Sequence, residues 1–341
     1  MGAEYRIGAP PAVVGDTDAK LRDVEYVLPL RWHDDEAREE LTAYLSALTR
    51  AVDVTVVDGS PPALFAAHHD AWPWVRHIPP AWPGLNGKAR GAMTGLARAR
   101  HELVIIADDD VRYDPASLAA VRARLESADF VRPQNYFATL PWHARWDTGR
   151  TVLNRASGGD FSGTIAVRRS ILTSEGYDTD VLFENLQLER TVRALGGRVD
   201  VARDVFVERL PPRVDRFWEQ RVRQAYDEFA RPWRLILQLL VLPALAAAAA
   251  TRNWRAVAIA AAAVVAVAEA GRRRACGAGV FDRAAALWAL PWLAERSVTS
   301  WLALVHRLRG GIPYRGARLQ RACAPVGPRR RRRPRTSEPI R

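Results

Sequence analysis

Three consecutive carboxylates, Asp108, Asp109 and Asp110, follow the short apolar run of residues 103–107. The run is rich in β-branched side chains and is typical of a buried parallel strand. Such a strand places the three acids at the edge of a sheet, where their negative charges repel one another. A divalent cation that carries a phosphorylated ligand would offset this repulsion best. The three acids are therefore the first candidate for a functional site.

A second strand that ends in an acid precedes the first. Residues 52–57 are mostly apolar and lead into Asp58, and a short strand at 25–30 and a helix at about 35–50 come before them. This β-α-β order predicts parallel strands joined by a right-handed crossover. Ligands of open α/β sheets bind at the carboxyl ends of the strands. Asp58 together with Asp108 and Asp110 thus predicts transfer from a diphosphate-activated donor, although Asp also favours such positions because it forms Asx-turns.

Lys88 is one of two lysines in a chain that otherwise uses arginine, and it lies in the glycine-containing segment 84–91. This segment is not a P-loop, because Trp82 occupies the position of the first glycine and Ala89 that of the Ser or Thr. An exposed, solvated lysine is the alternative to a ligand-binding one. No Gly-x-Ser-x-Gly elbow and no Cys/His pair is evident in the sequence, so a hydrolase is not predicted.

The histidines and cysteines do not form a recognisable motif. His68, His69 and His77 fall in a stretch rich in Pro and Trp, where we expect exposed side chains, with a substrate-facing role as the alternative. The only two cysteines, Cys276 and Cys323, are far apart. They predict neither a disulfide framework nor a zinc site, and they fit a reducing, cytoplasmic setting.

The charge of the chain points to an anionic partner. Its 341 residues carry a net charge of +12, almost wholly from arginine, and much of the excess lies in residues 272–274 and 329–333. An anionic membrane or a nucleic acid would match this charge. Because the basic C-terminal segment has no interleaved aromatic residues, we expect contact with anionic lipid and no specific binding of nucleic acid. The N-terminus has no apolar core of a secretory signal.

Two long apolar segments follow residue 234. We predict membrane-spanning helices at 235–251 and 254–271, although each is at or below the usual length of about 20 residues for a span. The alternative is a buried helical hairpin of a soluble domain. Trp254 and the flanking arginines favour the membrane. A further apolar segment at 284–305 is interrupted by Pro291, Glu295 and Arg296, so we expect an interfacial segment or a third span.

The expected organisation follows from these observations. Residues 1–22 form a mobile lead-in, and residues 23–212 form an α/β domain with a mostly parallel sheet flanked by helices. Residues 213–234 form an amphipathic helix at a membrane or substrate interface. Residues 235–306 form the membrane helices, and residues 307–341 form a basic tail on the cytoplasmic side.

The order of the motifs in residues 24–225 resembles that of a family 2 glycosyltransferase of GT-A fold. In such enzymes the first acid contacts the nucleobase, and an Asp-x-Asp motif holds the donor diphosphate through Mg²⁺ or Mn²⁺. The resemblance therefore implies that Asp58, Lys88, Asp108 and Asp109 bind the nucleotide sugar and that Asp110 and Asp108 bind the metal. The motifs that carry it are Val27-Leu28-Pro29, Val57-Asp58-Gly59-Ser60, Gly87-Lys88-Ala89-Arg90, Asp108-Asp109-Asp110 and Gly163-Thr164 to Arg168-Arg169.

Residues 177–188 resemble the Glu-Asp region that supplies the catalytic base in this family, with Asn185 in place of the second acid. Asn cannot accept a proton from a hydroxyl group, whereas the adjacent Glu184 can. Glu184 is therefore the expected base. A helix-capping role for Glu184 is the structural alternative, and Asp178 or Asp180 is the alternative base.

Residues 220–224 resemble the Gln-x-x-Arg-Trp motif of membrane-linked members such as ceramide-glucosyltransferase-like enzymes, with Gln224 in place of the tryptophan. Arg223, or else Arg221, is expected to offset charge on the leaving diphosphate.

The resemblance predicts a membrane-associated, metal-dependent glycosyltransferase that acts with inversion. A UDP-sugar is the expected donor, and a lipid-linked or cell-envelope glycan is the expected acceptor. The catalytic domain would lie on the cytoplasmic side of the cell membrane. The alternative is a noncatalytic membrane-binding or nucleic-acid-binding protein on a degenerate transferase fold.

Overall fold

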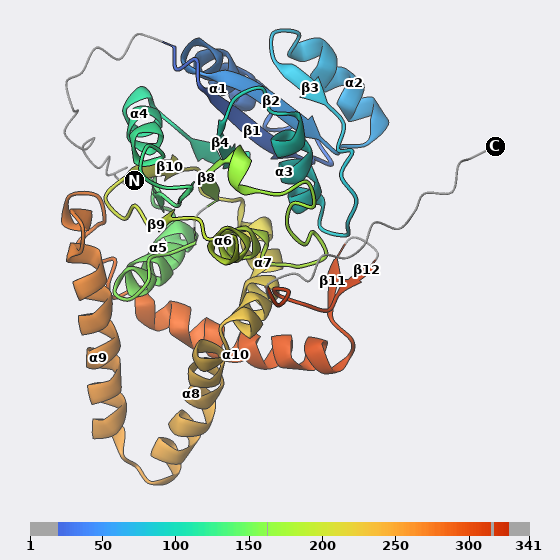
Figure 1. The fold of residues 1–341 in the computed structure, drawn as a ribbon. Helices are drawn as coiled ribbons and strands as arrows, with labels where there is room; N and C mark the ends of the chain where they lie inside the picture. Colours follow the sequence, from blue (N-terminus) through green and yellow to red (C-terminus); the bar gives the residue numbers. More distant parts are fainter. Residues whose placement is uncertain (1–19, 162, 315–316, 327–341) are drawn as a thin grey trace.

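A computed structural model describes residues 20–161, 163–314 and 317–326. Most of the predicted lead-in, residues 1–19, and the arginine run at 329–333 lie outside the described residues. Figure 1 shows a sheet domain formed by the first two thirds of the chain and a helical part that extends away from it.

The main sheet places the predicted acid-ended strands side by side. β1 (Val24–Leu30) pairs in parallel with β2 (Asp53–Asp58) and β4 (Leu103–Ala107), so that their carboxyl ends lie at one edge. β8 (Thr164–Arg168) runs antiparallel to β4. A smaller sheet of β5 (Val111–Arg112), β10 (Phe206–Arg209) and β7 (Gln134–Tyr136) adjoins this region. The main sheet has the order β3 (Arg76–Ile78), β2 (Asp53–Asp58), β1 (Val24–Leu30), β4 (Leu103–Ala107), β8 (Thr164–Arg168), β6 (Phe130–Val131) and β9 (Val199–Asp200).

Alternating side chains of the strands build a core on each face of the sheet. Tyr26 and Leu28 of β1 pack against α1 (Arg38–Ala51) and α4 (Pro115–Arg124) on one face. Val27 packs against α3 (Gly87–Arg98) and α6 (Glu184–Ala194) on the other. Gly95 allows α3 to approach β1 closely, because a Cβ there would lie 2.2 Å from Val27 Cγ1.

The stretch between Ser60 and Gly87 is more ordered than the sequence suggests. It contains α2 (Pro62–Ala71) and strand β3, neither of which we predicted. His68 is the buried side chain of α2, so the helix lacks the repeated apolar face that would mark it in the sequence. Pro62 in the first turn is favourable, since its fixed φ suits a helix start.

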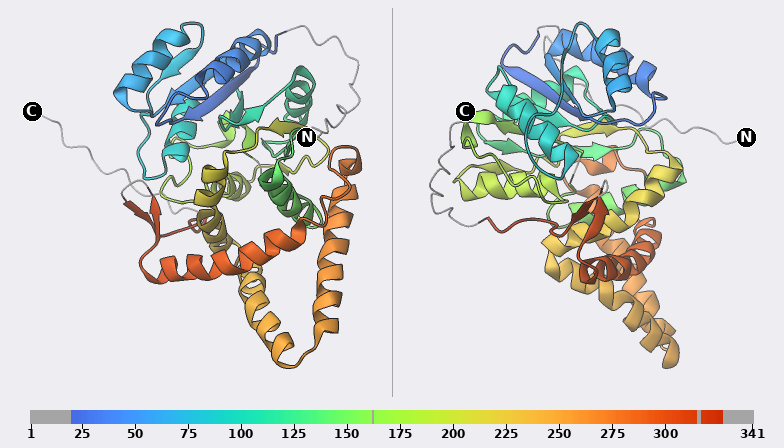
Figure 2. Two further views of the ribbon diagram at one scale, coloured as in Figure 1. Left: turned by 180° about the vertical axis from the view of Figure 1, so that it is seen from behind. Right: turned by 90° about the vertical axis from the view of Figure 1, so that its right-hand side faces the viewer.

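The two long apolar helices form an exposed hairpin. α8 (Pro232–Ala250) and α9 (Trp254–Arg273) are long and apolar enough to cross a membrane, and in each the most apolar window is 11% buried. Ile259 is 71% exposed and Trp254 is 61% exposed. The views agree that the hairpin projects from the rest of the molecule (Figures 1 and 2). The alternative of a hairpin buried in a soluble domain is therefore wrong.

α10 (Ala289–Leu308) lies across α5 (Trp142–Arg155), α7 (Val214–Tyr226) and α8. Its buried face includes Arg296, Ser297, Thr299 and Ser300. Its exposed face carries large apolar side chains, among them Trp301, Leu302 and Leu308. Within the described residues α10 is not among the helices that meet the criteria for a span, so the structure gives no support to a third span at 284–305.

Part of the segment that we expected to be a basic tail folds onto the sheet domain. β11 (Ile312–Tyr314) and β12 (Ala317–Leu319) form a hairpin. The backbone N–H of Phe183 then donates to Ala322 O, 2.9 Å away. Ile312 and Leu319 are buried in one cluster with Tyr226 and Ala303. Because of this apolar burial, the described residues after 306, namely 307–314 and 317–326, do not form a solvated tail.

Several short 3-10 helices join the elements named above. They are η1 (Arg169–Ile171), η2 (Asp227–Ala230) and η3 (Gly277–Gly279). The predicted amphipathic helix at 213–234 ends as α7 at Tyr226 and continues through η2 into α8. Its buried face, which includes Phe217 and Arg221, contacts α10.

A buried ion pair anchors α7 to α5. Arg221 Nη1 and Nη2 donate to the two carboxylate oxygens of Asp147 over 2.8 and 3.2 Å, and both side chains are less than a tenth exposed. Removal of Asp147 leaves the buried charge of Arg221 with only the longer contact of 3.8 Å to Glu295 among the described carboxylates. We expect Asp147→Ala to lower the free energy of unfolding by about 3–5 kcal/mol, as measured by chemical denaturation in detergent.

Asp23→Ala is the matched control, because it removes the exposed partner of Arg122, 2.9 Å away. Exposed pairs contribute about 0–1 kcal/mol. Equal losses of stability in the two variants would contradict a structural role for the Asp147 pair.

Candidate active site

Lys88 joins two residues that the sequence predicted separately. Its Nζ lies 2.6 Å from Asp108 Oδ1 and 2.9 Å from Glu184 Oε1. Burial alone would lower the pKa of Lys88, but attraction to the two carboxylates raises it overall, so the ammonium group stays charged. The structure thus brings together the end of β4, the first turn of α3 and the first residue of α6.

Asn86 positions this group. Its side-chain oxygen caps α3 by accepting from the backbone N–H groups of Lys88 and Ala89, and also accepts from Tyr314 Oη. Its Nδ2 donates to the carbonyl of Val181 over 2.8 Å. The capped helix start, the loop that carries Glu184 and the C-terminal hairpin are therefore linked through one side chain.

One carboxylate oxygen of Asp110 has a hydrogen-bond partner, and the other has none among the described residues. Oδ2 accepts from Arg209 Nε over 2.9 Å, and Arg209 Nη2 lies 2.8 Å from the same atom. Oδ1 is buried and has no hydrogen-bond partner among the described residues. A buried anionic oxygen without a donor is costly, and it is the kind of ligand that Mg²⁺ or Mn²⁺ prefers. Asp110 therefore fits a divalent cation.

Asp109 has a different environment from its two neighbours. Trp32 Nε1 donates to its Oδ2 over 2.5 Å. Burial, and then repulsion from Asp110 and Asp108, raises the pKa of Asp109 to about 6. The three consecutive acids thus have three separate partners: Lys88 for Asp108, Trp32 for Asp109 and Arg209 for Asp110.

The raised pKa of Asp109 predicts a pH-dependent effect on stability. In the unfolded chain Asp109 loses its proton near pH 3.8, whereas in the folded protein it does so near pH 6. Stability therefore falls as the pH rises through this window, because the folded state then binds more protons than the unfolded state. Without metal and nucleotide, Asp109→Asn should become more stable relative to the unsubstituted protein by about 1–2 kcal/mol between pH 4 and pH 7.5.

This value allows for the partial exposure of the side chain, and Asn can still accept from Trp32. Denaturation in the presence of a chelator at the two pH values measures it. A stability difference that does not change with pH would contradict the raised pKa.

A cavity of about 210 Å³ lies beside Lys88 and Asp108. It is formed where the sheet domain meets α5, α7, η2 and α10, and its lining is strongly charged. The acidic lining residues are Asp108, Asp160, Glu184, Asp227 and Glu228, and the basic ones are Lys88, Arg150, Arg209, Arg231 and Arg296.

The structure brings the predicted base into this cavity. Glu184 lines it and is 13% exposed at its side chain. Asp178 and Asp180 do not line it, and they bond locally: Asp180 accepts from Leu85 N, and Asp178 accepts from Asp180 N. Among the three predicted carboxylates, the geometry therefore favours Glu184.

The predicted arginines occupy other places. Arg221 is held by Asp147, and Arg223 is not among the residues that line the cavity. Gln224, one residue further along α7, lines it and accepts from Arg150 and Arg296 over 3.5 and 3.4 Å. The helical turn of α7 thus directs residue 224 to the cavity in place of residue 223.

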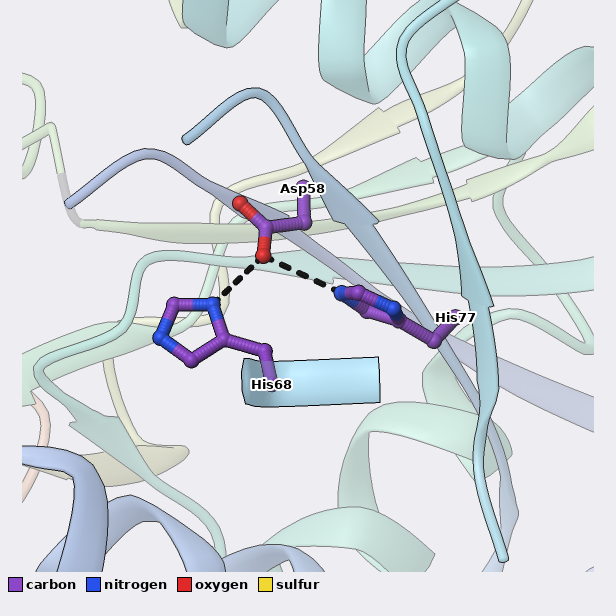
Figure 3. A group of neighbouring side chains, drawn as sticks. All are labelled: Asp58, His68 and His77. Atoms are coloured by element: carbon purple, nitrogen blue, oxygen red, sulfur yellow. Dashed lines mark hydrogen bonds and ion pairs between the residues drawn. The ribbon is translucent and has the colours of Figure 1, made fainter. Parts of the chain in front are cut away.

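Asp58 lies in a buried cluster with two histidines (Figure 3). Its Oδ2 contacts His68 Nδ1 at 2.6 Å and His77 Nε2 at 3.0 Å, and its Oδ1 accepts from Ser60 N. Burial tends to raise the pKa of Asp58, but the hydrogen bonds from His77, Ser60 and His68 lower it to about 2. The carboxylate is therefore ionised and fully engaged.

The histidines of this cluster are not exposed, so our expectation for His68 and His77 is wrong. They are 0% and 9% exposed, because α2 and β3, which the sequence did not reveal, bring them to the end of β2. Asp58, His68 and His77 have ligand atoms within 4.8 Å of one another and could hold a metal ion. The contacts of 2.6 and 3.0 Å are hydrogen-bond lengths, so the cluster is complete without one.

Most of the basic lining of the cavity was not found from the sequence. Arg150, Arg231 and Arg296 come from three helical segments far apart in the chain, and no local spacing connects them. Arg209 is the last residue of strand β10. The predicted acids likewise lie at the carboxyl ends of β2 and β4. The position of Arg209 at a strand end was the one signal that could have identified it.

Comparison with known proteins identifies the fold. The chain matches no protein-family model and no curated protein. Among solved structures it is similar to the mannosyltransferase PcManGT from Pyrobaculum calidifontis, determined with GDP-Man and Mn²⁺. The identity is 19%, the TM-score is 0.56, and the match covers 86% of this chain and 90% of the other. The chain has the GT-A fold.

A second similar structure is glucosyl-3-phosphoglycerate synthase from Mycobacterium tuberculosis, determined with Mg²⁺ and uridine diphosphate. The identity is 18% and the TM-score is 0.41, over 61% of this chain and 79% of the other. The predicted α/β class with a mostly parallel sheet is confirmed by the GT-A fold, and Asp108 at the end of β4 lines the cavity described above.

Proposed function

We propose that the protein is a glycosyltransferase that moves a sugar from a nucleotide-diphospho-sugar to a hydroxyl group. The observation that carries this proposal is the bridge from Asp108 through Lys88 to Glu184 at the wall of one cavity. It places a candidate cation and phosphate site next to a candidate base, which are the two parts that such a transfer requires. The GT-A fold supports the proposal.

The donor diphosphate would bind at the end of β4. Asp110 and Asp108 would hold Mg²⁺ or Mn²⁺, which supplies positive charge to the diphosphate when it is bound. Lys88 and Arg209 add two cationic donors at the same place. Asp109, fixed by Trp32, keeps the strand end in the conformation that presents its neighbours.

Glu184 would remove the proton from the acceptor hydroxyl as its oxygen attacks the anomeric carbon. The bond from that carbon to the diphosphate breaks on the opposite side, so the configuration is inverted. Lys88 would hold Glu184 in position before the reaction through their contact of 2.9 Å, and it would stabilise the negative charge of the leaving diphosphate during the reaction. Asn185 and Asp227 line the cavity beside this base.

Asp58 and Arg223 would act differently from the roles that the sequence predicts for them. Since Asp58 is 1% exposed and bonded to two histidines, it would shape the nucleobase site through Ser60 and Trp32, whose backbone N–H donates to Ser60 Oγ. Arg223 lies outside the cavity lining, and the leaving-group role falls to Arg209 and Lys88 instead.

The exposed α8 and α9 hairpin supports attachment to a membrane by two spans or by a dipping hairpin. The first and last residues of this hairpin lie on the side of the GT-A domain (Figure 1). We propose that the domain faces the cytoplasm and that the acceptor is a lipid-linked or cell-envelope glycan.

Thermal unfolding of the detergent-solubilised protein with a panel of nucleotide sugars tests this function. We expect a UDP-sugar, or a GDP-sugar like the one bound to PcManGT, to raise the melting temperature only when Mn²⁺ or Mg²⁺ is present. If no nucleotide sugar of the panel changes the melting temperature beyond the change caused by the cation alone, the result would favour the alternative of a noncatalytic membrane-binding protein.

A further inference from the structure

The residues that line the cavity include three arginines with buried N–H groups that have no acceptor among the described residues. Arg296 Nε and Nη1, Arg231 Nε and Arg150 Nε are buried and have no hydrogen-bond partner among the described residues. All three side chains line the cavity. Each unsatisfied buried donor costs about 1–3 kcal/mol, so a ligand that accepts from them would gain affinity.

Arg296 is the clearest of the three because it forms no ion pair with a described residue. It is 1% exposed, and its contacts there are a bond of 3.4 Å to Gln224 and a distant approach to the ring of Trp292. The adjacent Glu295 contacts Arg221 at 3.8 Å and Thr299 at 2.8 Å instead. A buried guanidinium group without a carboxylate partner requires an anion to offset its burial.

The nearby carboxylates do not supply that anion. Asp160 pairs with Arg150 at 3.2 Å, and Glu228 is shared by Arg231 at 3.0 Å and Arg234 at 3.2 Å. Burial and the charge of Glu184 raise the pKa of Asp227 well above its ordinary value, which favours its neutral form. Asp160 and Glu228 therefore pair with Arg150, Arg231 and Arg234, and neither of them forms an ion pair with Arg296.

These arginines lie on the helical side of the cavity, in α5, α10 and the junction of η2 with α8. The candidate donor residues Asp108 and Lys88 lie on the sheet side. Arg231 also immediately precedes α8, where Trp233 is 60% exposed and Ile236 is 55% exposed. A ligand bound at the arginines could thus extend an apolar chain along α8.

We propose that Arg296, Arg231 and Arg150 form a subsite that binds a phosphate group of the acceptor. The proposal rests on the proposed glycosyltransferase function and adds to it that the acceptor is a phosphate ester. Guanidinium groups bind phosphate through paired N–H donors, and the three unsatisfied Nε–H groups supply such donors. The phosphate could belong to a lipid or to a soluble phosphate ester.

The test measures direct binding of four probes to the full chain in detergent: geranyl phosphate, geraniol, glycerol 3-phosphate and glycerol. We expect the phosphates to bind and the two alcohols to bind far more weakly. Arg296→Met should weaken phosphate binding by about 10- to 100-fold, the loss of hydrogen bonds to a charged group. Arg231→Met provides a second variant in case the first is unstable.

Arg216→Met is the matched control, because Arg216 is an exposed arginine of α7 paired with Glu219. It should leave phosphate binding unchanged. Tighter binding of geranyl phosphate than of glycerol 3-phosphate would identify a lipid source, and equal binding would identify a soluble one. Either result supports the subsite.

Binding of nucleoside diphosphate with Mn²⁺ to the same proteins separates this proposal from the donor site. It should be equal in Arg296→Met and in the unsubstituted protein. Equal loss of donor and phosphate binding would overturn the proposal, since the arginines would then belong to the donor site. Alcohols that bind as well as the phosphates, or an Arg296→Met variant that binds like Arg216→Met, would also overturn it. Absent donor binding with intact phosphate binding would refute the glycosyltransferase function alone.

Discussion

Glu184→Gln should lower kcat for sugar transfer by about 100- to 10,000-fold, the usual contribution of a general base. Gln keeps the size of the side chain but cannot accept a proton from the acceptor hydroxyl. Lys88 would keep Asp108 as a partner at 2.6 Å, so binding of the donor nucleotide should change little. The measurement is the steady-state rate with the donor sugar identified by thermal stabilisation, together with the affinity for its nucleoside diphosphate.

Asp180→Asn is the matched control for this variant. Asp180 is an exposed acid in the loop that precedes α6, and its Oδ1 accepts a hydrogen bond from Leu85 N. The amide oxygen of Asn can accept the same hydrogen bond. We expect the kcat of Asp180→Asn to stay within about twofold. If Asp180→Asn were as inactive as Glu184→Gln, or if Glu184→Gln retained full activity, Glu184 would not be the base.

Asp110→Asn should lower kcat/KM by about 1,000-fold or more, because it weakens both the cation site and the charge stabilisation of the leaving diphosphate. The buried Oδ1 that has no donor would no longer carry a full negative charge. The amide oxygen can still accept from Arg209, so the local fold should persist. A rise in the Mn²⁺ concentration required for half-maximal activity is the readout that separates loss of the metal from a general loss of structure.

Asp23→Ala again provides a control, since it removes an exposed acid that does not line the cavity. Unaltered metal dependence in Asp110→Asn would show that Asp110 is not a metal ligand. The activity would then depend on Asp108 or on cationic side chains alone.

The sequence was sufficient to predict the part of the site that belongs to single strands. The apolar runs before Asp58 and before Asp108 both became parallel neighbours of β1, because buried strands leave a strong local pattern. Asp114 and Pro115 likewise form a local start signal for helix α4, in which Asp114 accepts from Ser117 N. Such features depend on neighbours in the chain and can be read locally.

The environment of Asp58 could not be predicted in the same way. His68 reaches it from α2 and His77 from β3, and both elements are short and lack an apolar repeat. The pairing depends on the order of strands in the sheet, which places β3 next to β2. Sequence spacing alone does not contain that order.

The helical half of the cavity could not be predicted either. Arg150, Gln224 and Arg296 meet there from α5, α7 and α10, although Arg296 comes 146 positions after Arg150 in the sequence. Arg223 and Gln224 differ by one position, and only the rotation of α7 decides which of them faces the cavity. That rotation is set by the packing of Phe217 and Arg221 against α5 and α10.

The central claim is that the acids at the end of β4 bind a nucleoside diphosphate through a divalent cation. Isothermal titration of UDP and GDP into the purified protein, with Mn²⁺ and with a chelator, tests it most directly. We predict that one nucleotide binds with Mn²⁺, that the chelator abolishes binding, and that Asp110→Asn weakens it by about 100-fold or more. Binding that is equal with Mn²⁺ and with the chelator, or equal in Asp110→Asn, would contradict the claim.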